Sequence, residues 1–497
     1  MKRIYLIYFV LLVFSFSCTE NFDEFNTDKR NPTQVEGEFL FSNGQIELVD
    51  QISSTNVNLN VWKLWAQYWT ETTYTDEENY DIVNRTIADN AFDVYYTNVL
   101  KSLDEARKLI EEDELEPTES EAQRTNKLMI IELMEIFTYH NLINIFGDVP
   151  YENAMDIENI SPAYNDAASI YSDLINRIDN ALSNLDPNEP SYVGAADIIY
   201  GGDVSNWIKF ANSLKLKMAI NVADVDDEVD FSVQDVIEEA VAEGVITSPS
   251  ENAILEYLGS SPNTNTLYED LILSGRKDFV PANTLVDTMV GLADPRLDNF
   301  FSNQIDTSDN GIDDPVWLGG EYGFSASYTS HSHIGNKVLE PTFPGFLITY
   351  SEVQFYIAEA AARGYNVGQT AEEAFDEAVR ASILFWDGTN GDASDYLNAH
   401  PYASYASWKE AIGLQSWLAA YTRGFLGYTT YRRLDQPDIM NTPDPDVYKT
   451  DNGVVPLRFT YPINEQTLNA ENYRAAAEAI GGDDLETPLF WDVSTPF

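Results

Sequence analysis

The sequence predicts a mostly α-helical protein, and two apolar patterns together with a scarcity of strand-like patterns lead to that prediction. In residues 95–112 the apolar side chains recur at three- and four-residue spacing and form one helical stripe: Val99, Leu100, Leu103, Ala106, Leu109 and Ile110. Residues 127–146 are apolar on more than one side, which predicts a helix buried between neighbours. Alternation of apolar and polar residues, which is typical of half-buried strands, is scarce.

The remaining helices and their connections follow from the same kind of pattern. Helical periodicity also covers residues 167–185, 206–223, 351–364 and 371–386. Segments rich in Asp, Asn, Gly, Pro and Ser predict irregular linkers at 186–203, 248–266, 302–345 and 387–404. The expected architecture is a set of helices interrupted by long loops.

Two of these helices carry a packing motif as well as a period. The spacing A-x3-F-x2-A, in which small residues let paired helices of a tetratricopeptide repeat approach, is met by Ala371, Phe375 and Ala378. A looser version consists of Ala167, Tyr171 and Leu174. Such triads also arise by chance, and the copies do not follow the regular repeat of about 34 residues. We therefore expect tetratricopeptide-like helix pairs separated by loops and not an intact solenoid.

The chain begins with a pattern typical of an export signal. Lys2 and Arg3 precede thirteen uncharged, mostly apolar residues, and Ser17 stands directly before Cys18. This run is shorter than the roughly 20 residues that span a membrane, so residues 1–17 are predicted to be a secretory signal peptide. A small residue followed by Cys resembles the lipobox of bacterial lipoproteins, where cleavage leaves a lipidated Cys as the first residue. The alternative is an ordinary signal peptide with a stray thiol.

Composition excludes several classes of function. The 497 residues include 28 Lys and Arg against 82 Asp and Glu, a formal net charge of −54. This charge repels nucleic acid and anionic lipid headgroups, so no nucleic-acid partner is expected. A hydrophobic content of 44% is nevertheless ample for a folded core. Cys18 is the only cysteine, so the mature chain has no thiol for catalysis and no disulfide.

Residues suited to catalysis or to metal binding are few. His140 lies in the apolar helix and is predicted to be a core residue, whereas His331 and His333 form an H-x-H pair without a recognisable third metal ligand. Neither a phosphate-binding loop nor a nucleophile elbow is present. With 82 acidic residues, a carboxylate pair near any groove carries no information. The sequence therefore predicts no catalytic residue, no cofactor and no metal.

One acidic turn, residues 306–315, partly matches a calcium-binding loop. Loop positions 1, 3, 5 and 6 are occupied by Asp306, Ser308, Asn310 and Gly311. Position 12, which requires a bidentate glutamate, is Trp317. A solvated acidic turn is the favoured interpretation, and calcium binding between Asp306 and Asp314 is the alternative.

Eight sequence blocks in a fixed order carry a family resemblance. They are NTDKRNPT (26–33), INIFGDVPYENA (143–154), IYGGDVSNWIKFANSLKLKMAI (199–220), ADPRLDNFF (293–301), LITYSEVQFYIAEAAARG (347–364), YRRLDQP (431–437), RFTYPINEQTLNAENY (458–473) and TPLFWD (487–492). Together they resemble the SusD/RagB family of outer-membrane lipoproteins of Bacteroidetes, in the branch called SusD-like. Lys29 and Arg30 depart from the usual Pro-Asn, and Phe490 from a Trp.

The resemblance implies both a fold and a function. Residues 18–497 would form a single, mostly α domain, with residues 18–40 as an N-terminal tether. In the family, a tetratricopeptide-like half packs on a SusC-like TonB-dependent transporter, and a loop-rich half captures an oligosaccharide. The protein would be anchored to the outer membrane through Cys18, exposed at the cell surface, and would act as a hinged lid on the transporter. The alternatives are the same scaffold binding peptides and a surface glycoside hydrolase that uses a carboxylate pair.

Aromatic residues in loops are the candidates for ligand binding, because sugar rings stack on flat aromatic faces. In the family, ligand residues come from early loops and from the long insert after the block that contains Asp294 to Leu297. The early candidates are Trp69, Tyr74, Asn79 and Tyr80, and the late ones are Trp317, Tyr322 and Tyr328. Trp62 and Trp65 share a helical stripe with Trp69, and for these two we expect core packing.

Overall fold

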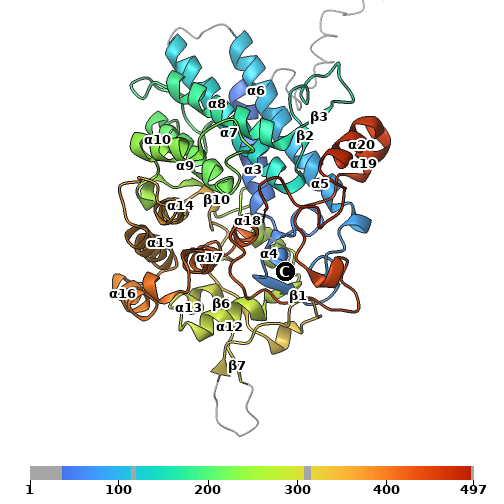
Figure 1. Cartoon of the computed structure of the whole chain (residues 1–497), viewed down its shortest axis with the longest axis vertical. Helices are drawn as coiled ribbons and strands as arrows, with labels where there is room; N and C mark the ends of the chain where they lie inside the picture. Colours follow the sequence, from blue (N-terminus) through green and yellow to red (C-terminus); the bar gives the residue numbers. More distant parts are fainter. Residues whose placement is uncertain (1–35, 114–118, 307–314, 494–497) are drawn as a thin grey trace, which may run out of the picture.

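Helices make up most of the structure, a computed structural model that describes residues 36–113, 119–306 and 315–493 (Figure 1). Outside the described residues lie Cys18, the predicted signal peptide at 1–17, most of the predicted tether at 18–40, and residues 307–314 of the acidic turn. Residues 37–40, also expected in the tether, already belong to the first described helix. The predicted mostly α fold is confirmed.

Long helices that follow one another in sequence pack side by side in the upper half of Figure 1. In chain order they are α3 (Gly37–Ser53), α6 (Lys101–Glu112), α7 (Glu121–Phe146), α8 (Ala167–Asn184), α9 (Val204–Asn221) and α10 (Val233–Glu243). The series continues with α14 (Tyr350–Ala362), α15 (Ala371–Phe385), α16 (Asn390–Ala399), α17 (Trp408–Ala419) and α18 (Gly424–Leu434). We call these elements the helical half; α14 joins its two parts by packing against α9.

Helix α7 shows how the sequence fixes a buried helix. Ser120 caps its first turn by accepting a hydrogen bond from the Gln123 amide (3.0 Å). Its C-terminal half is buried from Ile136 to Phe146, as predicted for a helix that is apolar on more than one side and lies between neighbours. Gly147 adopts a positive φ of 86° directly after the helix, a conformation that favours glycine.

The predicted tetratricopeptide-like pairing is realised by α14 and α15. Thr370 and Glu373 form a reciprocal capping box at the start of α15. Phe375 and Ala378 are fully buried, and the Phe375 ring meets Phe355 of α14 edge-on at 6.3 Å. The prediction of a linker at 387–404 is wrong in part, because a second capping box, between Thr389 and Asp392, starts the helix α16 within it.

The strands are short, and in the described part of the chain they pair only as two-stranded antiparallel sheets. The pairs are β1 (Trp69–Glu71) with β5 (Phe279–Pro281), β2 (Val149–Pro150) with β3 (Tyr164–Asn165), β4 (Ala253–Leu255) with β10 (Gly345–Ile348), β6 (Phe301–Ser302) with β9 (His333–Ile334), and β7 (Ile305–Asp306) with β8 (Pro315–Val316). Shorter helices complete the fold: α4 (Trp62–Trp65), α5 (Ile87–Asp93), the π-helix η2 (Val94–Leu100), α11 (Thr266–Tyr268), α12 (Asn283–Gly291), α13 (Leu297–Phe300), α19 (Ile463–Leu468) and α20 (Ala470–Ala479).

An aromatic cluster surrounds α4 in the core. Trp62 stacks on Phe459 (4.3 Å between ring centroids) and meets Trp65 edge-on at 5.3 Å, so the predicted core packing of both tryptophans is confirmed. The expectation that Trp69 continues their helical stripe is wrong. Helix α4 ends at Trp65, because Gln67 takes a left-handed φ of 55° and turns the chain into β1.

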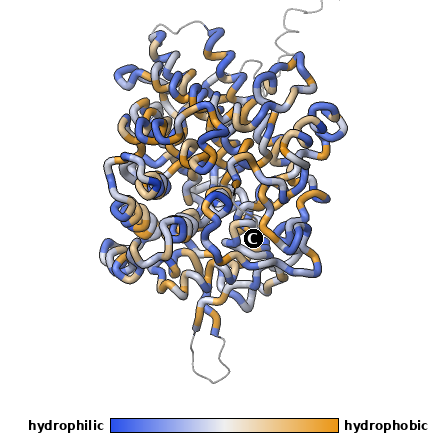
Figure 2. The backbone as a smooth tube through the Cα atoms, in the orientation of Figure 1, coloured by the Kyte–Doolittle hydropathy of each residue, from blue (hydrophilic) through white to orange (hydrophobic). Residues whose placement is uncertain are grey.

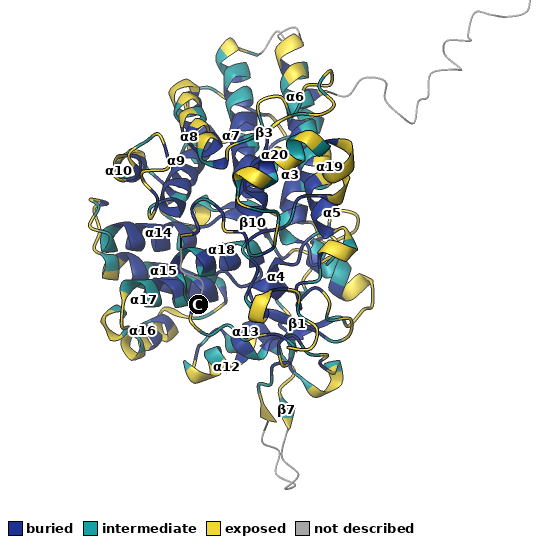
Figure 3. Cartoon of the chain, turned by 45° about the vertical axis from the view of Figure 1, so that its right-hand side comes forward, coloured by how far each residue is buried: buried dark blue, intermediate teal, exposed yellow. Residues whose placement is uncertain are grey.

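Burial follows the apolar pattern of each helix. Figure 2 shows hydrophobic and hydrophilic residues alternating along the helices. Figure 3 shows that buried residues fill the middle of the molecule while exposed ones gather at helix ends and loop tips. Among the described residues, no helix combines the length and the apolar character needed to cross a membrane.

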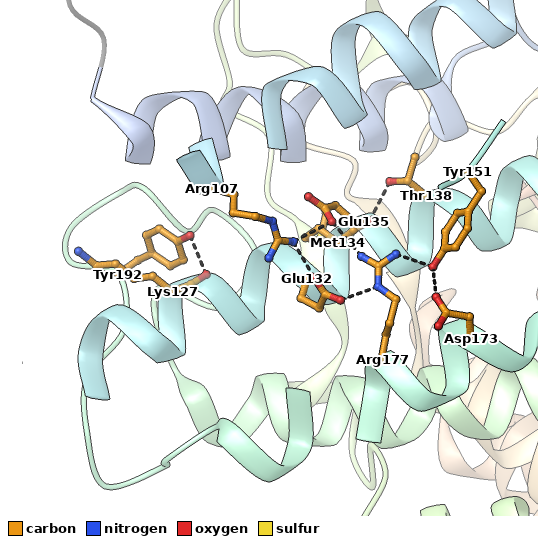
Figure 4. A network of polar contacts seen from close by, with 10 residues as sticks. All are labelled: Arg107, Lys127, Glu132, Met134, Glu135, Thr138, Tyr151, Asp173, Arg177 and Tyr192. Carbon is orange, nitrogen blue, oxygen red and sulfur yellow. Dashed lines mark hydrogen bonds and ion pairs between the residues drawn. The ribbon is translucent and has the colours of Figure 1, made fainter. Parts of the chain in front are cut away.

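A network of ion pairs ties α6, α7 and α8 together (Figure 4). Arg107 contacts both Glu132 (2.6 Å) and Glu135 (2.7 Å), and Arg177 contacts the same two carboxylates at 2.5 and 2.9 Å. Arg177 also donates to the hydroxyl of Tyr151 (2.8 Å). Each guanidinium group thus joins two carboxylates of α7 to a neighbouring helix, and these charge-assisted contacts favour one relative placement of the three helices.

Candidate ligand-binding surface

Two segments that are far apart in the sequence hold the loop after β1 between them. On one side, Thr72 donates its amide to the Asp278 carbonyl (2.8 Å) and its hydroxyl to the Lys277 carbonyl (2.6 Å). On the other side, the amide of Ala326 donates to the Glu71 carbonyl (3.1 Å) and the hydroxyl of Ser325 to the Thr72 carbonyl (2.5 Å). The early loop and the late insert predicted to supply ligand residues therefore adjoin each other.

Tyr74 projects from this loop into solvent. Its side chain is 77% exposed, and its φ of 60° lies in the left-handed region that bulky residues rarely adopt. Such a conformation persists only where the surroundings impose it. The fold thus presents an open aromatic ring at a fixed place beside the late insert.

Tyr328, in the late insert, is half-buried and fixed by its neighbours. Its ring stacks on His333 at 3.8 Å with 15° between the planes, and Nζ of Lys277 lies 5.0 Å from its centroid. His333 donates Nε2–H to the Tyr328 carbonyl (2.8 Å), and His331 donates Nδ1–H to the Ser327 carbonyl (2.8 Å). The H-x-H pair therefore shapes its own loop.

Trp317 lies next to the same histidines. It is half-buried against Phe301, with 6.0 Å between the ring centroids. The residue after it, Leu318, exchanges hydrogen bonds with Ser332: its amide donates to the Ser332 hydroxyl (3.0 Å), and its carbonyl accepts from the Ser332 amide (2.8 Å). Tyr74, Trp317 and Tyr328 thus occur on connected loops, which we call the aromatic surface.

The expectation of exposure is wrong for the four other predicted residues: Trp69, Asn79, Tyr80 and Tyr322, all at most 1% exposed. Trp69 is buried because β1 pairs with β5, and its indole donates to the Tyr421 hydroxyl (3.2 Å). The Tyr80 ring meets Trp65 edge-on at 6.0 Å inside the core. Burial raises the pKa of Tyr322 well above its ordinary value. A ligand on the aromatic surface has no direct access to these side chains.

Asn79 acts as a clamp beneath the aromatic surface. Its amide nitrogen donates to the carbonyls of Thr75 (2.7 Å) and Gly323 (2.8 Å), and its Oδ1 accepts from the Asp444 amide (3.0 Å). One buried side chain thus provides hydrogen-bond partners for backbone groups of three segments. Asn79 therefore positions the loop that carries Tyr74.

Three glutamates are buried under the same loop: Glu71, Glu77 and Glu78. Glu78 accepts from the Thr70 hydroxyl (2.6 Å), and Glu77 pairs with Arg85 (2.8 Å). Burial, followed by the charges of Glu78 and Glu77, raises the pKa of Glu71, and burial raises the pKa of Glu78 well above its ordinary value. In the described ranges, no three His, Cys, Asp or Glu side chains are placed to hold a metal ion.

The family model described as "Starch-binding associating with outer membrane" matches residues 29–462, which is most of the chain. The chain belongs to this SusD-like family. No curated protein matches it. The family description also associates its members with the outer membrane.

Solved structures agree with the SusD-like fold over nearly the whole chain. A chitin-binding protein superimposes with a TM-score of 0.78 at 23% identity, covering 92% of this chain and 100% of its own. A chitin-binding SusD homologue from Flavobacterium johnsoniae gives 0.75 at 20% identity, covering 93% and 99%. A SusD-like protein from Bacteroides thetaiotaomicron gives 0.76 at 21%, covering 92% and 99%.

The aromatic surface of this SusD-like chain also includes residues whose role could not be predicted from the sequence. Lys277 and the buried glutamates acquire their place only through tertiary contacts, because their partners lie in other segments. His333 was noticed only as half of a potential metal pair, whereas the structure uses its ring as the support of Tyr328. A local signal exists for neither role.

Proposed function

We propose that this SusD-like protein is a cell-surface lipoprotein that captures an oligosaccharide and delivers it, as a hinged lid, to a SusC-like TonB-dependent transporter. The observation that carries the proposal is the aromatic surface, where the exposed ring of Tyr74 adjoins the insert that holds Tyr328 and Trp317. Family membership and the chitin-binding proteins of the same fold favour a glycan as the ligand.

The chemistry of the aromatic surface suits a carbohydrate. Aromatic rings offer flat apolar faces to the C–H groups of a sugar ring, and the rings of Tyr328 and Trp317 are held by His333 and Phe301, which limits the conformational entropy lost on binding. The loops around them expose hydroxyl groups, among them those of Thr73, Ser327 and Thr329, which can bond sugar hydroxyls. Side-chain amides and carboxylates elsewhere on these loops would add orientation.

Removing an aromatic ring from this surface is expected to weaken ligand binding. Tyr74→Ala and Trp317→Ala should each cost about 1–3 kcal/mol of binding free energy, the usual scale for a stacked aromatic anchor. Isothermal titration calorimetry on the true ligand measures the loss, and we expect melting temperatures close to that of the wild type. Phe39→Ala, which removes an exposed ring from α3, is the matched control.

Unchanged affinity in both variants would remove the aromatic surface from the ligand site. A collapse of the melting temperature in Trp317→Ala would instead make Trp317 a core residue, since it packs against Phe301. The Tyr74 variant keeps the test decisive in that case, because its side chain is exposed.

A binding panel separates the proposal from its alternatives. Purified protein is titrated with oligosaccharides of chitin and starch and with peptides of similar length, and the bound ligand is then recovered after prolonged incubation. We expect an oligosaccharide to bind and to be recovered intact. Binding of peptides alone would favour the peptide-binding alternative, and cleavage of the oligosaccharide would favour a hydrolase with a carboxylate pair.

The proposed anchor depends on Cys18. Each buried acyl methylene contributes about 0.8 kcal/mol, so two or three acyl chains hold a protein at a membrane while its body stays in water. In cells without the partner transporter, Cys18→Ala protein is expected in the soluble fraction and wild-type protein in washed outer membranes. Retention of the variant in those membranes would contradict lipid anchoring at Cys18.

A further inference from the structure

A cavity in the helical half has a mainly apolar lining with a few polar and cationic side chains, and its lining residues differ from those of the aromatic surface. Its walls come mainly from α7 and α18, with further residues from α3, α9 and the segment that leads into β10. About 60 Å³ is open to the centres of water-sized molecules. Because about 10–15 Å³ suffices for one water, the cavity has room for a small ion with part of its hydration shell.

The charged side chains that line this cavity are all cationic: Lys217, Arg423 and Arg433. Within the described part of the chain, no carboxylate belongs to the lining. This is unexpected in a protein with 82 acidic and 28 basic residues. The cavity thus offers an anion a local environment opposite in sign to the protein as a whole.

The carboxylates that pair with these cations do not balance them. Glu352 accepts from both Lys217 (2.8 Å) and Arg423, so one negative charge serves two positive ones. Arg433 pairs with Glu359, which also accepts from Arg363 (2.9 Å). Arg363 has Asp224 as a second partner (2.7 Å), and Asp224 also pairs with Lys409 (3.5 Å), so the carboxylates do not outnumber the cations in this second group. One positive charge at Lys217 and Arg423 therefore remains in excess.

Two buried N–H donors without a partner belong to α7 side chains that line the cavity. Nε2 of His140 accepts from the amide of Asn144 (2.9 Å), whose Oδ1 in turn accepts from Asn221 (3.3 Å). The ring proton of His140 therefore resides on Nδ1, and neither this N–H nor the amide nitrogen of Asn141 has a hydrogen-bond partner. Both side chains line the cavity and are at most 3% exposed. A buried donor left unpaired costs about 1–3 kcal/mol.

We propose that this cavity binds a small monovalent anion, a halide or a small carboxylate, held by Lys217 and by the N–H groups of His140 and Asn141. Such an ion neutralises the excess charge and accepts from donors that the protein leaves unpaired. It also opposes the effect of burial, which lowers the pKa of Lys217. Residues of α7, α9 and α18 line the site, so the ion would link the two parts of the helical half.

Bromide is the probe, because its anomalous scattering identifies it in a crystal. Crystals of the mature protein soaked in sodium bromide are expected to show one anomalous peak inside the cavity at the bromine edge. Further crystals are soaked with sodium acetate added to the bromide. Loss of the peak would identify a carboxylate as the preferred ion, and persistence of the peak would identify a halide. Water alone in the cavity, with no peak, would overturn the proposal.

Variants test the same site in solution. At constant ionic strength, replacing sodium gluconate with sodium bromide is expected to raise the melting temperature of wild-type protein in a saturable manner. Lys217→Met should lose this rise. Lys209→Met, on the same helix but paired with Glu251 outside the cavity (2.6 Å), should keep it. If Lys217→Met does not fold, His140→Phe serves as the cavity variant in its place and should also lose the rise. Equal bromide responses in the cavity and control variants would contradict the proposal.

Discussion

Replacing Arg296 with methionine is expected to lower the free energy of unfolding by about 3–5 kcal/mol, as for other buried ion pairs that lose one partner. The side chains of Arg296 and Asp294 are 1% and 0% exposed and form a bidentate pair, with distances of 2.9 and 2.6 Å. Arg296 also donates to the hydroxyl of Ser382 on α15 (2.9 Å). Without the guanidinium, the Asp294 carboxylate is left charged, buried and without its cation.

Chemical denaturation measures this loss, and an exposed pair provides the control. Arg276 pairs with Asp278 at 2.5 Å, but their side chains are 68% and 36% exposed. Arg276→Met should cost at most about 1 kcal/mol, because solvent screens exposed ion pairs. Equal losses in the two variants would show that burial of the Asp294 pair does not set its contribution.

Replacing Glu71 with glutamine is expected to stabilise the protein above neutral pH and to change how its stability depends on pH. Burial and the charges of Glu78 and Glu77 raise the pKa of Glu71 to about 11, so at neutral pH it keeps a proton. An unfolded glutamate ionises near pH 4.5. Between the two pKa values the folded state binds one more proton, so rising pH destabilises wild-type protein.

The glutamine variant has no such proton to lose. Its advantage in unfolding free energy over the wild type should therefore grow by about 1.4 kcal/mol per pH unit, or about 3 kcal/mol from pH 6 to pH 8. Denaturation series at several pH values measure this difference. Glu321→Gln, an exposed site in the adjoining insert, should show little change. If the difference in unfolding free energy between Glu71→Gln and wild type did not change with pH, Glu71 would not be the group that retains the proton.

The helices could be predicted because their signals are local. The apolar stripe of α6, the apolar character of α7 on more than one side and the small residues of α15 each specify both an element and the face it buries. Helix α16 was missed because Gly391 and its acidic neighbours suggested a loop, although the capping box at Thr389 was already present in the sequence. The helix propensity of these residues predicted a loop, whereas the capping box predicted the start of a helix, and the structure contains the helix.

The candidate site could be predicted in outline but not residue by residue. The two segments expected to contribute to it adjoin each other, and Tyr74 is exposed as expected. The residues next to Trp69 and Tyr322 in the sequence resemble those around an exposed loop aromatic. In the fold, however, β5 covers Trp69 and the core encloses Tyr322. Asn79 looked like a ligand contact because free amides bond sugars. Its partners, Gly323 and Asp444, are invisible from the local sequence.

The links between the first and last parts of the chain set an order for its assembly. Gln67 exchanges two hydrogen bonds of 2.8 Å with the backbone of Asn441, which lies 374 residues further on. Contacts of such long range form late, because the entropy of closing the intervening chain is lost before they stabilise anything. A chain that emerges N-terminus first thus carries Tyr74 long before the segment that locks its loop has arrived. The proposed ligand surface is accordingly completed only at the end of folding, once the C-terminal segment is present.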